Sequence, residues 1–309
     1  MAKYLSGSRR RPLSRGLLLL VLVLIVASGS ISVYFLYPFG SPGVTRVKGD
    51  RVAIIDALSD FNPNPSFEEE AKGYVTAAGM SVDTYNSSVV SIDFMKSFPA
   101  GYDLVVFRVH SATSRHGVFY FTSEPYDEAK HQPEQYRDEV RPGRDYEGHP
   151  EVFAFGPKFV STYLQDRFQN AIIIGMGCFG AGTSYGTEEE VSIENVTIEK
   201  VPNLADAFYQ QGALAVIGWD KLVSLSFSDQ ATLRLIKALA VDRQTARQAV
   251  MITNREFGPD PSYKSVLVFY PEEGGDKVLH IPAAQHRNPS ETLQLPAHLA
   301  TLALRATIH

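Results

Sequence analysis

The sequence predicts an α/β fold of three layers, in which helices cover both faces of a mainly parallel central sheet. Short apolar runs such as Tyr102–Val109 and Ala171–Ile174 are typical of strands that are buried on both faces. Segments with helix-capping residues lie between these runs, as at Ser66 and Asn203. Strands that alternate with helices along a chain favour parallel pairing.

The first half of this body has clear boundaries between elements. Gly40–Gly49 is a Gly/Pro-rich tether, and Ser66 followed by Glu69 predicts a capping box that starts a helix. The expected elements are a strand over Arg51–Leu58, a helix over Phe67–Ala78, an edge strand over Met80–Tyr85, a short helix over Ser91–Phe98, and a strand over Tyr102–Val109.

The second half contains two polar stretches, which we interpret as insertions at about 112–151 and 183–202. Gly117–Thr122 is a β-like piece, and Glu124–Glu151 shows no periodicity and predicts an irregular segment. The further elements expected are a helix over Pro157–Phe168, a strand over Ala171–Ile174, a helix over Leu204–Gln211, a strand over Leu214–Gly218, helices over Ser228–Val241 and Thr245–Phe257, and a terminal hairpin over Val266–Tyr270 and Lys277–Ile281.

The N-terminal segment predicts a membrane anchor. Residues 1–15 are basic, and residues 16–39 are uncharged and long enough for the ~20 residues that span a bilayer. The positive-inside rule places the N-terminus in the cytoplasm, and it places a linker at 40–50 and a body at 51–309 outside the cytoplasm. The alternative is a signal peptide cleaved near Ala27, after which the body is secreted.

The composition excludes several classes of function. Without the seven basic residues that precede Asp50, 22 basic residues remain against 34 acidic ones, so the body carries a formal charge of about −12. Such a body lacks the basic surface that nucleic acid requires. The single cysteine, Cys178, excludes an internal disulfide and zinc sites built on several cysteines. No phosphate-binding loop, dinucleotide fingerprint or lipase-type serine motif occurs, and we expect no cofactor.

Two strand ends carry reactive side chains. His110 follows Tyr102–Val109, and Cys178 follows the run 171–174 within a glycine-rich turn. Because ligands bind beyond the carboxyl ends of parallel strands, we expect the imidazole and the thiol to lie at one edge of the sheet.

These blocks resemble the caspase–gingipain–legumain superfamily of cysteine peptidases. An apolar strand that ends in His and a small residue, Val105–Ser111, is followed downstream by a strand that ends in Cys-x-Gly, Ile172–Gly180. Asn203–Asp220 is similar to the helix and strand after the nucleophile in gingipain-like and CHAT-type members. The resemblance covers most of Arg51–Asp220 in element order and implies a caspase-like fold.

The resemblance also implies a pair of catalytic residues that hydrolyses peptide bonds. Cys178 would attack as a thiolate, and His110 would be the general base. The oxyanion would be held by the backbone N–H groups of Cys178 and Ser111, with Gly177 beside them. Family members commonly carry Gly where this chain has Ser111.

The specificity of such an enzyme is left open by the sequence. Some basic-specific relatives carry Asp two residues before the cysteine, where this chain has Met176. Other candidates for a substrate pocket are Asp56, Asp60, Trp219 and Asp220, because each lies near the carboxyl end of a predicted strand. The implied partner is a polypeptide substrate.

Other interpretations of the same residues remain open. A lone cysteine is often a small buried hydrophobe, and the same fold without activity would be a binding or scaffolding module at the cell surface. His110 and His116 with Asp127 would be the residues for a metal, but their spacing is not compact and we expect no metal.

Overall fold

A six-stranded sheet organises the part of the chain that the computed structural model describes, residues 50–114, 116–144, 150–181 and 203–281. All these residues belong to one of the two units into which the chain divides, Lys48–His309. In spatial order the strands are β10 (Leu267–Tyr270), β9 (Ala215–Trp219), β8 (Ile172–Gly175), β3 (Leu104–Arg108), β1 (Arg51–Asp56) and β2 (Ser81–Asn86). β10 is antiparallel to β9, and all other neighbours are parallel. The predicted α/β class with a mainly parallel sheet is confirmed.

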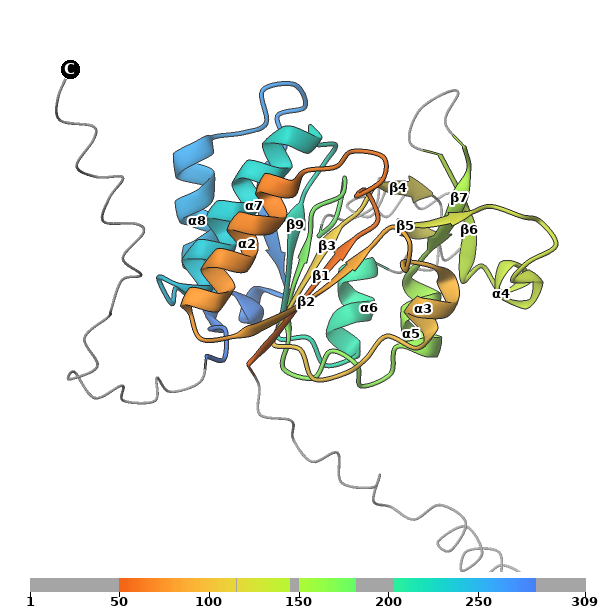
Figure 1. Ribbon diagram of the computed structural model, residues 1–309, viewed down its shortest axis with the longest axis horizontal. Coiled ribbons are helices and arrows are strands. Elements are labelled where there is room, and N and C mark those ends of the chain that lie inside the picture. Colours follow the sequence, from red (N-terminus) through yellow and green to blue (C-terminus); the bar gives the residue numbers. More distant parts are fainter. Residues whose placement is uncertain (1–49, 115, 145–149, 182–202, 282–309) are drawn as a thin grey trace, which may run out of the picture. The chain divides into compact units, whose positions relative to one another are not determined.

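Helices cover both faces of this sheet (Figure 1). One face carries α2 (Pro65–Ala77), α7 (Leu225–Ala240) and α8 (Ala246–Phe257), and the other carries α3 (Ile92–Lys96), α5 (Pro157–Tyr163) and α6 (Leu204–Gln210). Val52 and Ile54 pack in the core under the first set, whereas Ala53 and Ile55 pack in the core under the second set. Because the inner strands β1, β3, β8 and β9 are buried on both sides, they are mostly apolar, whereas the edge strand β2 is more exposed and polar.

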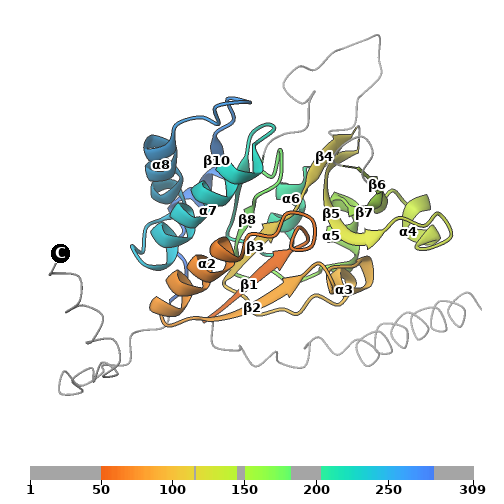
Figure 2. The same cartoon turned by 45° about the horizontal axis from the view of Figure 1, so that its top comes forward.

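A second sheet forms in and around the segment that the sequence predicted to be irregular. Its strands, in spatial order, are β4 (Ser111–Ser114), β5 (Gly117–Pro125), β7 (Val152–Phe155) and β6 (Val140–Gly143), all antiparallel, and α4 (Gln132–Tyr136) precedes β6. Figure 2 shows this sheet on the side of the central sheet that carries α3, α5 and α6. The β-like piece predicted at Gly117–Thr122 lies within β5, whereas α4 and β6 show that the expectation of an irregular 124–151 segment was wrong. Long-range pairing stabilises these short strands, so local periodicity does not reveal them.

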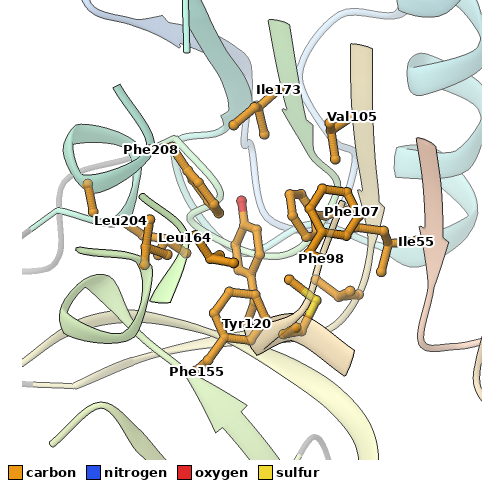
Figure 3. Packing of buried hydrophobic residues seen from close by; sticks show 14 of the residues in the cluster. Ile55, Phe98, Val105, Phe107, Tyr120, Phe155, Leu164, Ile173, Leu204 and Phe208 are labelled. Carbon is orange, nitrogen blue, oxygen red and sulfur yellow. The ribbon is translucent and has the colours of Figure 1, made fainter. Parts of the chain in front are cut away.

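Tyr120 of β5 links the second sheet to the main core. Its ring lies among Phe107, Phe155 and Phe208, with ring centroids 5.4, 6.0 and 6.1 Å away (Figure 3). Its buried hydroxyl donates to the carbonyl oxygen of Gly180 at 3.1 Å. The second sheet thereby supports the turn that follows β8.

Two predicted boundaries need correction. The helix predicted to begin at Phe67 begins two residues earlier, at Pro65, because Asn64 and not Ser66 is the N-cap and its side chain accepts from the N–H of Phe67. The predicted hairpin at the C-terminal end does not form. Instead, β10 pairs with β9. The residues that follow β10 form the 3₁₀ helix η1 (Glu272–Asp276), and Val278 forms a single antiparallel bridge with Thr245.

Within the described ranges, no helix has the length and apolar character needed to cross a membrane. The predicted anchor at 16–39, its basic flank at 1–15 and the insertion at 183–202 lie outside the residues that the structure describes.

Candidate active site

His110 and Cys178 occupy equivalent positions beyond two adjacent strands. β3 and β8 pair in parallel, and Phe107 lies opposite Gly175 at the end of the pairing. The N–H of Met176 donates to the carbonyl oxygen of Phe107 at 2.9 Å and extends this pairing by one hydrogen bond. His110 and Cys178 each lie three residues past the last pair, and both line one pocket of about 310 Å³. The structure thus brings the two predicted residues to one site.

The segments that carry these residues are in direct contact. The Ser111 hydroxyl donates to the carbonyl oxygen of Cys178 at 2.5 Å. Gly177 permits this approach, because a Cβ atom at that position would clash with the Ser111 hydroxyl and lie 2.8 Å from the carbonyl oxygen of Val109. The predicted oxyanion residues Ser111, Gly177 and Cys178 all line the pocket.

The Cys178 thiol is half-buried and is contacted by the segment after β9. The N–H of Val223 lies 3.5 Å from Sγ and donates to it. Burial raises the pKa of the Cys178 thiol, the Val223 N–H opposes this rise, and the charge of Asp260 adds to it. A thiol with a raised pKa stays protonated near neutral pH, so it needs a base to become a nucleophile.

His110 lies between two pockets. Besides the pocket of Cys178, it lines a second one of about 170 Å³, together with Ala57 and Leu58 at the carboxyl end of β1. Its ring centroid lies 6.5 Å from that of Phe121. The parallel strands β2, β1, β3, β8 and β9 follow the order 2-1-3-4-5, which places this second pocket at the switch point where ligands bind in such sheets.

A buried charge cluster fixes the end of β3 just before His110. Arg108 is 1 % exposed and lies opposite Asp56 in the register of β1 and β3. Its guanidinium donates to both carboxylate oxygens of Asp56, to both of Asp229 on α7, and to the carbonyl oxygen of Asn62. Burial raises the pKa of Asp56, and Arg108 opposes that rise. The cluster therefore uses all the donor nitrogens of Arg108 and joins β1, β3 and α7.

The remaining candidates for a substrate pocket lie in different parts of the structure. Met176 lines the Cys178 pocket, and Asp60 lines the second pocket of His110. Trp219 is 1 % exposed and packs in the core against Phe227, and its N–H donates to the hydroxyl of Ser228.

Asp56 and Asp220 are engaged in the fold. Asp56 pairs with Arg108, as described above, and Asp220 accepts hydrogen bonds from the Ser265 hydroxyl and the Val266 N–H. Asp56, Trp219 and Asp220 do not line the pocket that contains Cys178.

Sequence reasoning missed Arg108 and Asp260. Asp260 is fully buried and accepts from the N–H groups of Ser224, Ser262 and Tyr263, which fixes the segment that carries Val223. A charged residue within the apolar run YDLVVFRV was a signal for Arg108, because a buried guanidinium requires acidic partners. Asp260 stands in the loop sequence GPDPS, which gives no comparable signal.

No three His, Cys, Asp or Glu side chains are grouped as metal ligands in the described part of the chain. Nδ1 of His116, one of the residues considered as metal ligands, lies 3.6 Å from Oδ2 of Asp138.

Comparison with models of known protein families and with curated proteins finds no match to this chain.

Proposed function

We propose that this protein is a cysteine peptidase of the caspase-like type, with Cys178 as nucleophile and His110 as general base. The observation that carries the proposal is the placement of both residues three positions past the last pair of β3 and β8, in one pocket. The close approach of the segments that follow β3 and β8, which Gly177 permits, also supports the proposal.

The proposed reaction is a two-step acyl transfer. His110 accepts the thiol proton as Sγ of Cys178 attacks the carbonyl carbon of the peptide bond. The C–N bond breaks as His110 gives this proton to the leaving amine. His110 then takes a proton from water while the water oxygen attacks the thioester, and the C–S bond breaks as His110 gives this proton to Sγ, which releases the carboxylic acid product and restores the thiol. Backbone N–H groups of Ser111 and Cys178 are proposed to stabilise the oxyanion in both steps.

We propose that this domain is held outside the cytoplasm by the apolar segment 16–39. The support is the uncharged length of that segment and the basic residues before it. A cleaved signal peptide gives a secreted form of the same domain, and mass determination of the mature chain separates the two.

A binding module without activity is the second candidate, and two observations favour it. Burial raises the pKa of Cys178, and Ser111 replaces the glycine common at this position in the resembling family. In this case the pocket would hold a segment of a protein partner without cleaving it.

Cleavage of a peptide library by the full-length protein, purified in detergent, tests the first proposal. We expect cleavage by the wild type and a loss of at least about 100-fold in both Cys178→Ala and His110→Ala. Equal cleavage by wild type and Cys178→Ala contradicts the assignment of the nucleophile. No cleavage, with folded protein that retains peptide binding, favours the binding module.

A further inference from the structure

The pocket beside Cys178 is lined by both apolar and polar side chains, and the polar ones include His110, Ser111, Thr113 and Arg144. Its volume of about 310 Å³ lies at the lower end of the range for ligand pockets. The larger apolar side chains that line it include Phe121, Met176, Leu222, Val223, Leu225 and Tyr263. They come from β5, from the turn after β8, from the first residue of α7, and from the segments that connect β9 to α7 and α8 to β10.

Two of these apolar side chains are accessible at the rim. Leu222 is 45 % exposed and Tyr263 is 46 % exposed. Phe61, which lines the neighbouring pocket of His110, is 46 % exposed at the same edge of the sheet. Apolar side chains that remain in water around a pocket gain free energy when an apolar ligand covers them.

The described residues that line this pocket include one cation, Arg144, which forms a half-exposed pair with Glu151 at 3.0 Å. None of the described residues that line it is an Asp or a Glu. Asp260, close behind Val223, accepts three backbone N–H groups. A cationic substrate side chain would lose its hydration here without gaining a carboxylate partner from the described residues that line the pocket.

We propose that this pocket binds an aliphatic or aromatic side chain of a polypeptide, adjacent to the bond that Cys178 attacks. The inference rests on the proposed peptidase function and names its substrate class. Leu222 and Tyr263 are specificity-determining residues in this account. A preference for Arg or Lys is not expected, because the position of Met176 holds no acid to pair with a cation.

Two measurements on the same peptides test the proposal. The peptides are acetyl-Ala-Ala-Xaa-aminomethylcoumarin for cleavage and acetyl-Ala-Ala-Xaa-amide for protection of Cys178 from iodoacetamide, with Leu, Phe, Lys or Asp at Xaa. Each is measured with the full-length wild type, with Leu222→Asp, and with Met251→Asp as a matched control. Met251 is 63 % exposed on α8 and does not line the pocket.

We expect the Leu and Phe peptides to exceed the Lys and Asp peptides by at least about tenfold in kcat/KM and in protection. Leu222→Asp should remove most of this preference and improve the Lys peptide, whereas Met251→Asp should behave as the wild type. A preference for Lys or Asp in the wild type overturns the inference and leaves the peptidase function in place. Protection selective for Leu and Phe without cleavage supports a pocket for apolar side chains and contradicts the peptidase. Equal or absent protection together with no cleavage overturns both.

Discussion

The hydroxyl of Ser111 donates a hydrogen bond to the backbone carbonyl oxygen of Cys178 over 2.5 Å. Ser111 directly follows His110, so this one bond ties the segment of the imidazole to the segment of the thiol. The serine that departs from the pattern of the resembling family is therefore a structural link between the two segments. This relationship leads to the first prediction.

Ser111→Ala should lower the stability of the fold. Loss of the hydrogen bond leaves the Cys178 carbonyl without this donor and should reduce the free energy of unfolding by about 1 kcal/mol. Urea unfolding measures this value, with Ser88→Ala as the control because Ser88 is exposed and bonds only to the side chain of Asn86. Equal stability of the two variants would show that the Ser111 bond contributes nothing to the fold.

Gly177→Ala and Gly73→Ala should change stability in opposite directions. A Cβ at Gly177 meets Ser111 and Val109, so alanine should destabilise the protein by about 1–3 kcal/mol. Gly73 lies in α2 with nothing within 4 Å of an added Cβ, so alanine there should stabilise it by up to about 1 kcal/mol. Thermal unfolding of the two variants decides this. A neutral Gly177→Ala would contradict the close approach of the two strand-end segments.

Asp229→Ala should be among the most destabilising single changes. It leaves the buried Arg108 with only part of its partners, and breaking a buried pair costs about 3–5 kcal/mol. Asp242→Ala is a suitable control, because its pairs with Arg234 and Lys237 are half-exposed and should contribute less than about 1 kcal/mol. Chemical denaturation provides both values. A loss below about 1 kcal/mol for Asp229→Ala would contradict a buried cluster at the end of β3.

Asp260 should make stability depend on pH in the acidic range. Burial by itself would raise its pKa, but the N–H groups of Tyr263, Ser224 and Ser262 and the Ser224 side chain together lower the pKa below the ordinary value of 3.8. An acid with a lowered folded pKa contributes stability above its unfolded pKa and loses it as the pH falls through the folded pKa.

The difference in unfolding free energy between wild type and Asp260→Asn should therefore be largest from neutral pH down to about pH 4 and shrink below it. Denaturation at several pH values measures this difference. A difference that stays constant down to strongly acidic pH would show that the charge of Asp260 does not stabilise the fold.

The inner strands of the central sheet could be predicted from sequence because they are buried on both faces. Runs such as Ile172–Gly175 are continuous and apolar, and capping residues such as Asn203 mark the helices between them. The second sheet could not be predicted in full. β6, with the sequence VRPG, has no apolar alternation and forms only because it pairs with β7.

The sequence likewise predicted one part of the candidate site and missed another. Strand ends indicated His110 and Cys178, because the carboxyl ends of neighbouring parallel strands meet at one edge. The contact of Val223 with the thiol depends on how the segment after β9 returns over the sheet, and no local pattern encodes that path. Trp219 was a candidate for lining the substrate pocket, but its side chain is buried in the core under α7.

The most direct measurement of the central claim is the rate of Cys178 alkylation by iodoacetamide as a function of pH. As the only cysteine, Cys178 reports without interference from other thiols. The account predicts that wild type reacts readily near neutral pH, and that His110→Ala reacts at least about tenfold more slowly there, with its profile moved toward higher pH. Identical profiles for wild type and His110→Ala would contradict the claim that this imidazole activates the thiol.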